Sequence, residues 1–99
     1  MTRISAKFEA EILMGHKGAA VLVPFDPEEV WGIAPRKVAD QPGGQKGFRI
    51  RGTFAGARFE GWIGSRWGRR FILADEKLIR KAKVKVGDTV ELVIEPVAG

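Results

Sequence analysis

The sequence contains no cysteine and no long run of apolar residues. Without cysteine the chain has no disulfide framework, no thiolate metal site and no thiol nucleophile, which suits a reducing compartment. Because the apolar runs are only a few residues long, no segment is expected to cross a membrane as a helix. The charged start MTRISAKFEAE also lacks the apolar stretch of a signal peptide. We therefore expect a cytoplasmic protein that does not bind a membrane.

Histidine is scarce as well, since His16 is the only one in the chain. It lies between glycines in a predicted turn, where a solvated turn residue is a simpler interpretation than a general base or metal ligand. Ser5 and Ser65 have no identifiable base, so a nucleophilic triad is not indicated. The acidic groups at Asp26 and Asp75 are explained as helix caps. We therefore predict no enzyme, no catalytic residues, no metal and no cofactor.

The residues that are present suffice for one small domain. The 99 residues are 44% hydrophobic and 29% charged, a composition that fills one core and leaves no room for a second. The formal net charge is +5, and the basic excess lies within residues 46–99. A surface of this sign attracts nucleic acid or an acidic protein, but it also occurs as a merely solubilising surface.

Periodicity predicts mostly β-strands. Residues 7–13 alternate apolar and polar side chains, and residues 19–23 form a continuous apolar run, so both segments are expected to be strands. Asp26-Pro27 predicts a helix N-cap followed by proline at the first position of a helix of one to two turns. The segment QPGGQKG at 41–47 is rich in residues that break regular structure, and it predicts a surface loop.

The clearest prediction is a hairpin of residues 48–54 and 57–63. A two-residue loop at Ala55-Gly56 requires that the numbers of paired residues sum to 111. One face of that register is apolar and pairs large residues with small ones, as interdigitated packing needs. The pairs on the other face are Thr53 with Arg58, Arg51 with Glu60 in an ion pair, and Arg49 with Trp62 in a cation–π contact.

The second half of the chain continues with two further strands and a helix. The segment SRWG predicts a turn, and residues 69–74 predict a strand. A helix capped by Asp75 is expected to run to about Ala82. After a turn at Val86-Gly87-Asp88, a last strand is predicted from Thr89 to Glu95, ended by Pro96.

The chain also repeats itself. KFEAEI at 7–12 matches RFEGWI at 58–63, and the following turn, strand and helix cap recur in the same order about 50 residues later. Two similar halves, roughly 6–31 and 57–82, predict an all-β fold: a small barrel-like sheet with an internal pseudo-two-fold repeat and two short capping helices. Phe8 and Phe59 are expected in equivalent core positions. Because one chain carries both copies, we expect a monomer.

Several of these motifs resemble known folds. RRFILADEKLIRKAKVKVGDTVELVIE at 69–95 resembles the second half of swapped-hairpin folds of the AbrB and MazE type. The whole chain, over about residues 5–96, resembles more closely the domain of unknown function family 1905, in which one chain is similar to a complete double-split barrel. The family usually has a serine-leucine-proline stretch where this chain has GSRW at 64–67. The resemblance implies a double-split β-barrel and supplies no activity.

One cluster of residues suggests a binding surface. Tryptophan planes accept stacked bases, and guanidinium groups bind phosphate or carboxylate. Alternatively, the tryptophans pack beneath a capping helix and the arginines only solvate the barrel rim. The cluster consists of Trp62, Arg66, Trp67, Arg69 and Arg70, with Arg49 and Arg51 on the paired strand. From it we predict a candidate binding surface of Arg49, Arg51, Trp62, Arg66, Trp67 and Arg69.

Together these features predict a non-enzymatic binding or accessory module of unknown function and unknown partner. One alternative is a basic nucleic-acid-binding domain of AbrB-like type, and another is a small-molecule-binding protein or enzyme. A nucleic-acid role requires one continuous basic face. We expect Arg49, Arg51 and Arg58 to share such a face of the hairpin. The SRWGRR turn would add Arg66 and Arg69 at its end, and the helix lysines would point elsewhere.

Overall fold

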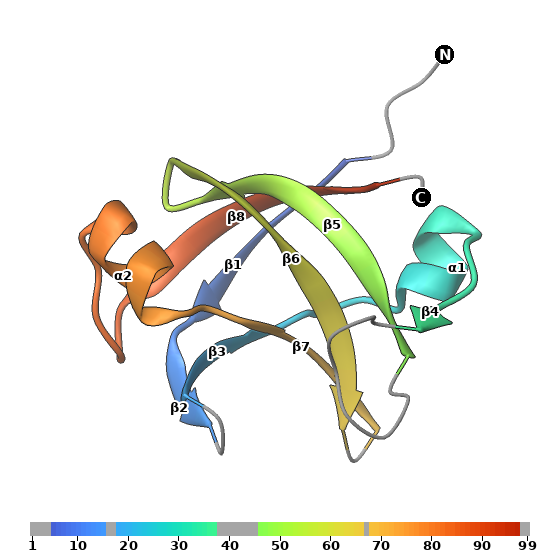
Figure 1. Ribbon diagram of the computed structural model, residues 1–99, viewed down its shortest axis with the longest axis horizontal. Coiled ribbons are helices and arrows are strands. Elements are labelled where there is room, and N and C mark those ends of the chain that lie inside the picture. Colours follow the sequence, from blue (N-terminus) through green and yellow to red (C-terminus); the bar gives the residue numbers. More distant parts are fainter. Residues whose placement is uncertain (1–4, 16–17, 38–45, 67, 98–99) are drawn as a thin grey trace.

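Eight strands and two short helices are seen in a computed structural model of the protein, which describes residues 5–15, 18–37, 46–66 and 68–97 (Figure 1). In chain order the elements are β1 (Ala6–Glu11), β2 (Leu13–Gly15), β3 (Gly18–Leu22), α1 (Pro27–Trp31), β4 (Arg36–Lys37), β5 (Lys46–Phe54), β6 (Ala57–Arg66), β7 (Arg69–Leu73), α2 (Glu76–Ala82) and β8 (Thr89–Pro96). The prediction of a mostly β protein is confirmed. No helix in these residue ranges is long and apolar enough to cross a membrane.

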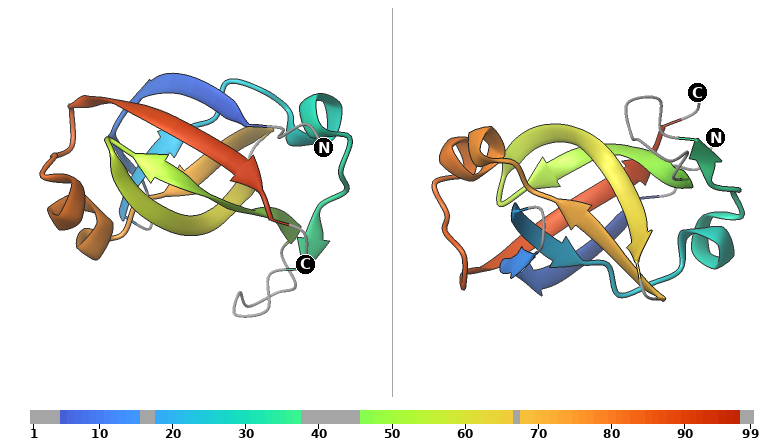
Figure 2. Two further views of the ribbon diagram at one scale, coloured as in Figure 1. Left: turned by 90° about the horizontal axis from the view of Figure 1, so that it is seen from above. Right: turned by 60° about the horizontal axis from the view of Figure 1, so that its bottom comes forward.

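The strands form one antiparallel sheet in the order β1-β8-β5-β6-β7-β3-β2, with β4 paired to β5. The sheet curls around an oval interior and is barrel-like (Figure 2). The two ends of the strand order, β1 and β2, follow each other in the chain and are separated by Ile12 alone. The helices α1 and α2 lie at opposite ends of the curled sheet (Figure 1).

The predicted hairpin register is confirmed for every pair of β5 and β6, from Phe54 opposite Ala57 to Phe48 opposite Ile63. The two turn residues, Ala55 and Gly56, have φ angles of 50° and 85°. A two-residue turn of this hand needs a positive φ at both positions, and alanine accepts it here although it is a poorer turn residue than Asn or Asp.

Both predicted helix caps are confirmed. The Asp26 carboxylate accepts a hydrogen bond from the Glu28 amide at 3.0 Å, and Pro27 begins α1. The Asp75 carboxylate accepts one from the Leu78 amide at 2.7 Å. Each bond satisfies an amide at the start of a helix that has no partner within the helix itself.

Several predicted boundaries differ from the structure. The turn predicted over SRWG is too long, since Ser65 and Arg66 belong to β6 and pair with Arg70 and Arg69. The strand predicted over 7–13 is interrupted at Ile12, because the Ile12 amide donates to Asp88 and its carbonyl accepts from Gly87, both at 2.8 Å, instead of pairing with a strand. The loop predicted over 41–47 is too long at its end, since Lys46 and Gly47 belong to β5 and pair with β4; residues 41–45 lie outside the described ranges. The last strand includes Pro96, which lies opposite Ile50.

The core fills the interior of the curled sheet and consists of apolar side chains alone among the described residues. Phe8 and Phe59 were expected there, but both are only half-buried and pack against the margin of the core. The Phe59 ring meets the fully buried Phe54 edge-on at 6.1 Å, and Phe8 meets Phe25 at 5.9 Å. The core residues are Ile12, Val21, Val23, Trp31, Phe48, Ile50, Phe54, Ile63, Ile72, Ala74, Leu78, Val90, Leu92 and Ile94.

Candidate interaction surface

Two regions of the outer face of the sheet differ in their chemistry. Because successive side chains of a strand point to opposite faces, the neighbours of a buried residue point outward. The charged region consists of outward side chains of β1, β8 and β5, namely Lys7, Glu9, Glu11, Glu91, Glu95 and Arg51. The apolar region consists of outward side chains of β2, β3 and β7, namely Leu13, Ala20, Leu22, Phe71 and Leu73.

Strand pairing makes the apolar region continuous. Ala20 lies between Leu13 on β2 and Leu73 on β7, and Leu22 lies opposite Phe71. The three leucines are 38% to 40% exposed, whereas Val21 and Ile72 on the same strands are fully buried. The outward leucines therefore leave apolar surface in contact with solvent although the core is already filled.

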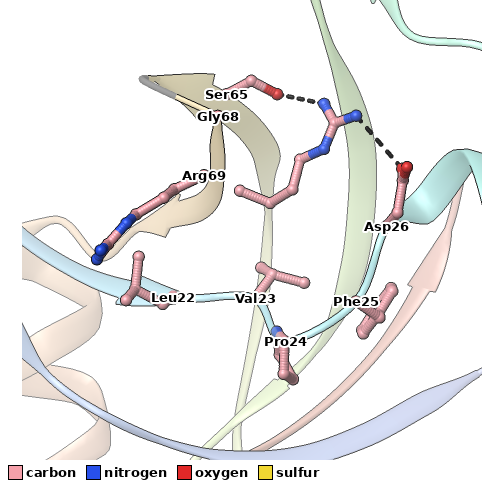
Figure 3. A pocket seen from close by; sticks show the side chains of 9 residues that line it. Leu22, Val23, Pro24, Phe25, Asp26, Ser65, Gly68 and Arg69 are labelled. Atoms are coloured by element: carbon pink, nitrogen blue, oxygen red, sulfur yellow. Dashed lines mark hydrogen bonds and ion pairs between the residues drawn. The ribbon is translucent and has the colours of Figure 1, made fainter.

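The strands of the apolar region contribute charge of one sign only. Next to Leu73, the acidic Glu60 and Asp75 are outnumbered by basic residues of β6 and α2, which are Arg58, Lys77 and Lys81. The strands β2, β3 and β7 contain no aspartate or glutamate. Arg69 is two residues before Phe71 on β7, and its exposed side chain lies beside Leu22 (Figure 3). Among the described residues, the structure gives Arg69 no ion-pair partner. This region therefore presents apolar surface next to an uncompensated positive charge.

The predicted surface residues Arg49 and Trp62 lie opposite each other, as the register required. Arg49 is exposed and Trp62 is half-buried. The cation–π contact expected between them is not formed in the described part of the chain. Instead, the Arg70 guanidinium lies over the Phe48 ring at 5.3 Å from its centre. Arg70 reaches this ring because it is on the same inner face of β7 as Ile72, and Phe48 is a core residue.

Arg51 belongs to the charged region. Glu60 is opposite Arg51 on β6 as predicted, but the predicted ion pair between them is wrong. Arg51 Nε binds Glu95 Oε1 at 2.8 Å instead. The reason is that β5 lies between β6 and β8, so Arg51 has a carboxylate on either side and pairs with the one on β8. Its charge is thereby compensated.

The remaining predicted residues lie at the turn between β6 and β7. The backbones of Arg66 and Arg69 pair across this turn, so the structure brings these two positions together. Trp67 lies outside the described residues. The expectation that the helix lysines point away from the hairpin is wrong for Lys81, whose Nζ donates to the Arg58 carbonyl at 3.0 Å, because α2 packs against β6.

An open depression of about 580 Å³ lies where β3 leads into α1. The Arg70 guanidinium binds the Ser65 hydroxyl through Nη1 and the Asp26 carboxylate through Nη2, the latter at 3.3 Å (Figure 3). Arg70 belonged to the arginine-rich cluster in the sequence, but it was not among the predicted surface residues. The signal that could have identified it is strand alternation, which places Arg70 on the face opposite to Arg69. The lining residues are Leu22, Val23, Pro24, Phe25, Asp26, Ser65, Gly68, Arg69 and Arg70.

Within the described ranges, no three histidine, cysteine or acidic side chains gather closely enough to hold a metal ion.

A family model described as Domain of unknown function (DUF1905) matches residues 8–94, which extend from β1 to β8. The chain belongs to this family. The resemblance inferred from the order of sequence motifs is thereby confirmed. No match was found among curated proteins. Since the family description names no activity, function has to be argued from the surface of the domain.

Proposed function

We propose that this DUF1905 domain is a non-enzymatic binding module that acts as a monomer in the cytoplasm. Its interaction surface would be the apolar region together with Arg69. The observation that carries the proposal is the row of three leucines, each 38% to 40% exposed, on adjacent paired strands. Scattered exposed apolar residues need no explanation, but a contiguous apolar group next to charged residues is typical of an interaction site.

The exposed leucine area suits a reversible contact. Completing the burial of a leucine that is already more than half covered contributes roughly 0.5 to 1 kcal/mol, scaled from about 2 kcal/mol for a whole side chain. Three such contributions offset only part of the cost of association. Further affinity would have to come from charged groups at the margin, so the chemistry of the margin selects the partner.

The partner that fits is a protein segment carrying both apolar and acidic side chains. Its apolar residues would cover Leu13, Leu22 and Leu73, and its carboxylates would meet Arg69. A basic segment would place like charges beside Arg69, which has no ion-pair partner among the described residues. It would also meet the basic majority next to Leu73, where Arg58, Lys77 and Lys81 outnumber Glu60 and Asp75. Charge complementarity therefore favours an acidic segment.

A pair of synthetic peptides tests this assignment. Both alternate leucine with a charged residue, glutamate in one and lysine in the other, and binding is followed by fluorescence anisotropy. We expect only the glutamate peptide to bind, and Leu22→Ser with Leu73→Ser to weaken its binding at least roughly tenfold, since about 1.4 kcal/mol corresponds to that factor. Val86→Ser removes an apolar residue of similar exposure (42%) elsewhere and serves as the matched control.

Two outcomes would overturn the proposal. One is equal binding of the two peptides, or equal weakening by the surface variant and by Val86→Ser. The other is light scattering that shows an obligate dimer at micromolar concentration whose dissociation requires Leu22→Ser and Leu73→Ser. In that case the apolar region would be a contact between two copies of the chain.

A nucleic-acid role is the second candidate. Arg49, Arg51 and Arg58 all point outward from the hairpin, by the same alternation that buries Ile50. Glu60 and Glu95 lie among them, and Arg51 is already paired. If the hairpin binds nucleic acid, binding to a labelled duplex should fall steeply with salt, and Arg49→Ala with Arg66→Ala should abolish it without unfolding the domain. Absence of binding at low salt would exclude this candidate.

We also propose that the barrel-like sheet is a double-split barrel with an internal two-fold axis. Support comes from β3 and β7, which pair antiparallel with Val21 opposite Ile72. These residues are 51 positions apart, close to the repeat spacing, and antiparallel pairing of two equivalent strands is what a two-fold axis between them produces. The test is superposition of residues 6–31 on 57–82 in an experimental structure; a rotation far from 180° would refute the repeat.

A further inference from the structure

The depression between β3 and the β6–β7 turn has features of a ligand site. It combines an apolar side, formed by Leu22 to Phe25, with the guanidinium groups of Arg69 and Arg70 and the hydroxyl of Ser65 (Figure 3). A volume of about 580 Å³ is within the range of small-molecule sites. An apolar wall with a few convergent polar groups is the usual composition of such sites.

Arg70 is held in place before any ligand binds. Its side chain is 26% exposed, and its guanidinium contacts the Phe48 ring, the Ser65 hydroxyl and the Asp26 carboxylate at once. A guanidinium has five N–H groups, and the hydrogen bonds to Ser65 and Asp26 use two of them. The side chain is therefore oriented by its neighbours while retaining donors for an additional acceptor.

The net charge of the depression favours a ligand that carries one negative charge. Among the described lining residues, Arg69 and Arg70 are opposed by Asp26 alone, which gives these residues a net charge of +1. A single carboxylate would neutralise this charge, whereas a phosphate dianion would leave a negative excess next to Asp26. Planar guanidinium groups also match the two oxygens of a carboxylate.

We infer that this depression binds one carboxylate group attached to an apolar body, with Arg70 as the donor to its oxygens and the side formed by Leu22 to Phe25 covering the apolar part. The Arg69 guanidinium points away from that of Arg70 and contributes positive charge at the margin of the depression (Figure 3). Leu22 and Arg69 also belong to the proposed interaction surface. The inference rests on the proposed function in one respect, because the natural source of the carboxylate would be the acidic partner segment. The depression would then be the place where a carboxylate of that segment is bound.

Hexanoate is a suitable probe because it joins a carboxylate to a short apolar chain. Binding is followed by amide chemical shifts of the full chain in two-dimensional NMR spectra. We expect saturable shifts at Val23, Ser65, Gly68 and Arg69. Hexanamide has the same shape without the charge, acetate lacks the apolar chain, and inorganic phosphate carries more charge. All three should bind more weakly than hexanoate.

Variants locate the site and separate binding from stability. Arg69→Gln should weaken hexanoate binding roughly threefold, since it removes a positive charge from the margin of the depression. The matched control is Arg80→Gln on α2, at the opposite end of the molecule (Figure 1), which should leave the affinity unchanged. Arg70→Gln should have the larger effect on binding, but it also removes contacts within the fold, so Arg69→Gln remains the decisive variant.

Several results would overturn the inference. These are shifts confined to residues outside the depression, equal binding of hexanoate and hexanamide, or equal weakening by Arg69→Gln and Arg80→Gln. The outcome is separable from that of the proposed function, because the hexanoate titration needs no partner. If the glutamate peptide binds and depends on Leu22 and Leu73 while hexanoate does not bind, the interaction surface stands and the carboxylate site is refuted.

Discussion

The charged and apolar regions of the outer face cover the same core with different chemistry. In the charged region, Lys7 pairs with Glu91 at 3.6 Å and Arg51 pairs with Glu95 at 2.8 Å. In the apolar region, leucines occupy the corresponding outward positions of β2, β3 and β7. The fully buried inner side chains are apolar in both regions, so folding requires neither composition outside. The charged region shows that this sheet tolerates solvated outer residues, which makes the exposed leucines a feature that packing does not explain.

The largest expected effect is a loss of stability, and it compares Gly52 on β5, next to β8 of the charged region, with Gly64 on β6, next to β7 of the apolar region. A Cβ atom on Gly52 would collide with the Val93 carbonyl oxygen, because β5 approaches the β8 backbone closely at this point. Gly52→Ala should therefore destabilise the domain by about 3 kcal/mol or more. A Cβ atom on Gly64 would come within 3.3 Å of the Phe71 ring, which can move. Gly64→Ala should cost less than about 1 kcal/mol.

Thermal unfolding of both alanine variants measures this difference. For a domain of this size, each kcal/mol corresponds to roughly 4 to 8 °C in Tm. Similar Tm values for the two variants would show that the β5–β8 approach is no tighter than the contact between Phe71 and Gly64.

The next effect separates the two faces of one strand. Ile72 and Leu73 are neighbours on β7, but Ile72 is fully buried whereas Leu73 is 39% exposed. Ile72→Ala should lower the free energy of unfolding by about 2 to 4 kcal/mol, because it leaves a cavity in the core. Leu73→Ala should lower it by less than about 1 kcal/mol. Urea denaturation measures both, and equal losses would mean that Leu73 is a structural residue and not part of an available surface.

The smallest effect compares Arg51 of the charged region with Arg70, which lies on the inner face of β7 beneath the apolar region. Arg70 has three different contacts and a 26% exposed side chain, whereas Arg51 is 58% exposed and has one ion pair. Arg70→Gln should destabilise by about 1 to 2 kcal/mol. Arg51→Gln should destabilise by less than about 0.5 kcal/mol, because exposed pairs contribute little. Urea denaturation at low and high salt provides the test, and a larger loss for Arg51→Gln would contradict the different roles assigned to these arginines.

Local sequence signals predicted a large part of the fold. Alternation and a two-residue turn fixed every pair of the β5–β6 hairpin. Asp26 and Asp75 marked both helix starts, because a cap is a contact between a side chain and amides two or three residues away. The break at Ile12 had no local signal, since its backbone partners Gly87 and Asp88 are far along the chain. Likewise, only the position of β8 beside β5 gave Arg51 the partner Glu95.

The candidate site was predicted less well. Arginines near the β6–β7 turn were identified from composition, and Arg69 does line the depression. The leucines of the apolar region were interpreted only as parts of strands, because a single strand does not show which strand it will lie beside. Leu13, Leu22 and Leu73 become one surface only when β2, β3 and β7 pair.

The amino-acid sequence by itself determined most of the strands, the two caps, the hairpin register and the family, since these depend on side chains within a few residues or on a linear order of motifs. The tertiary structure alone decided which carboxylate pairs with Arg51, where the chain bends between β1 and β2, and that Arg70, Ser65 and Asp26 meet at one depression. The physical reason is that these contacts join residues 5 to about 76 positions apart. Their geometry is fixed only when the sheet curls.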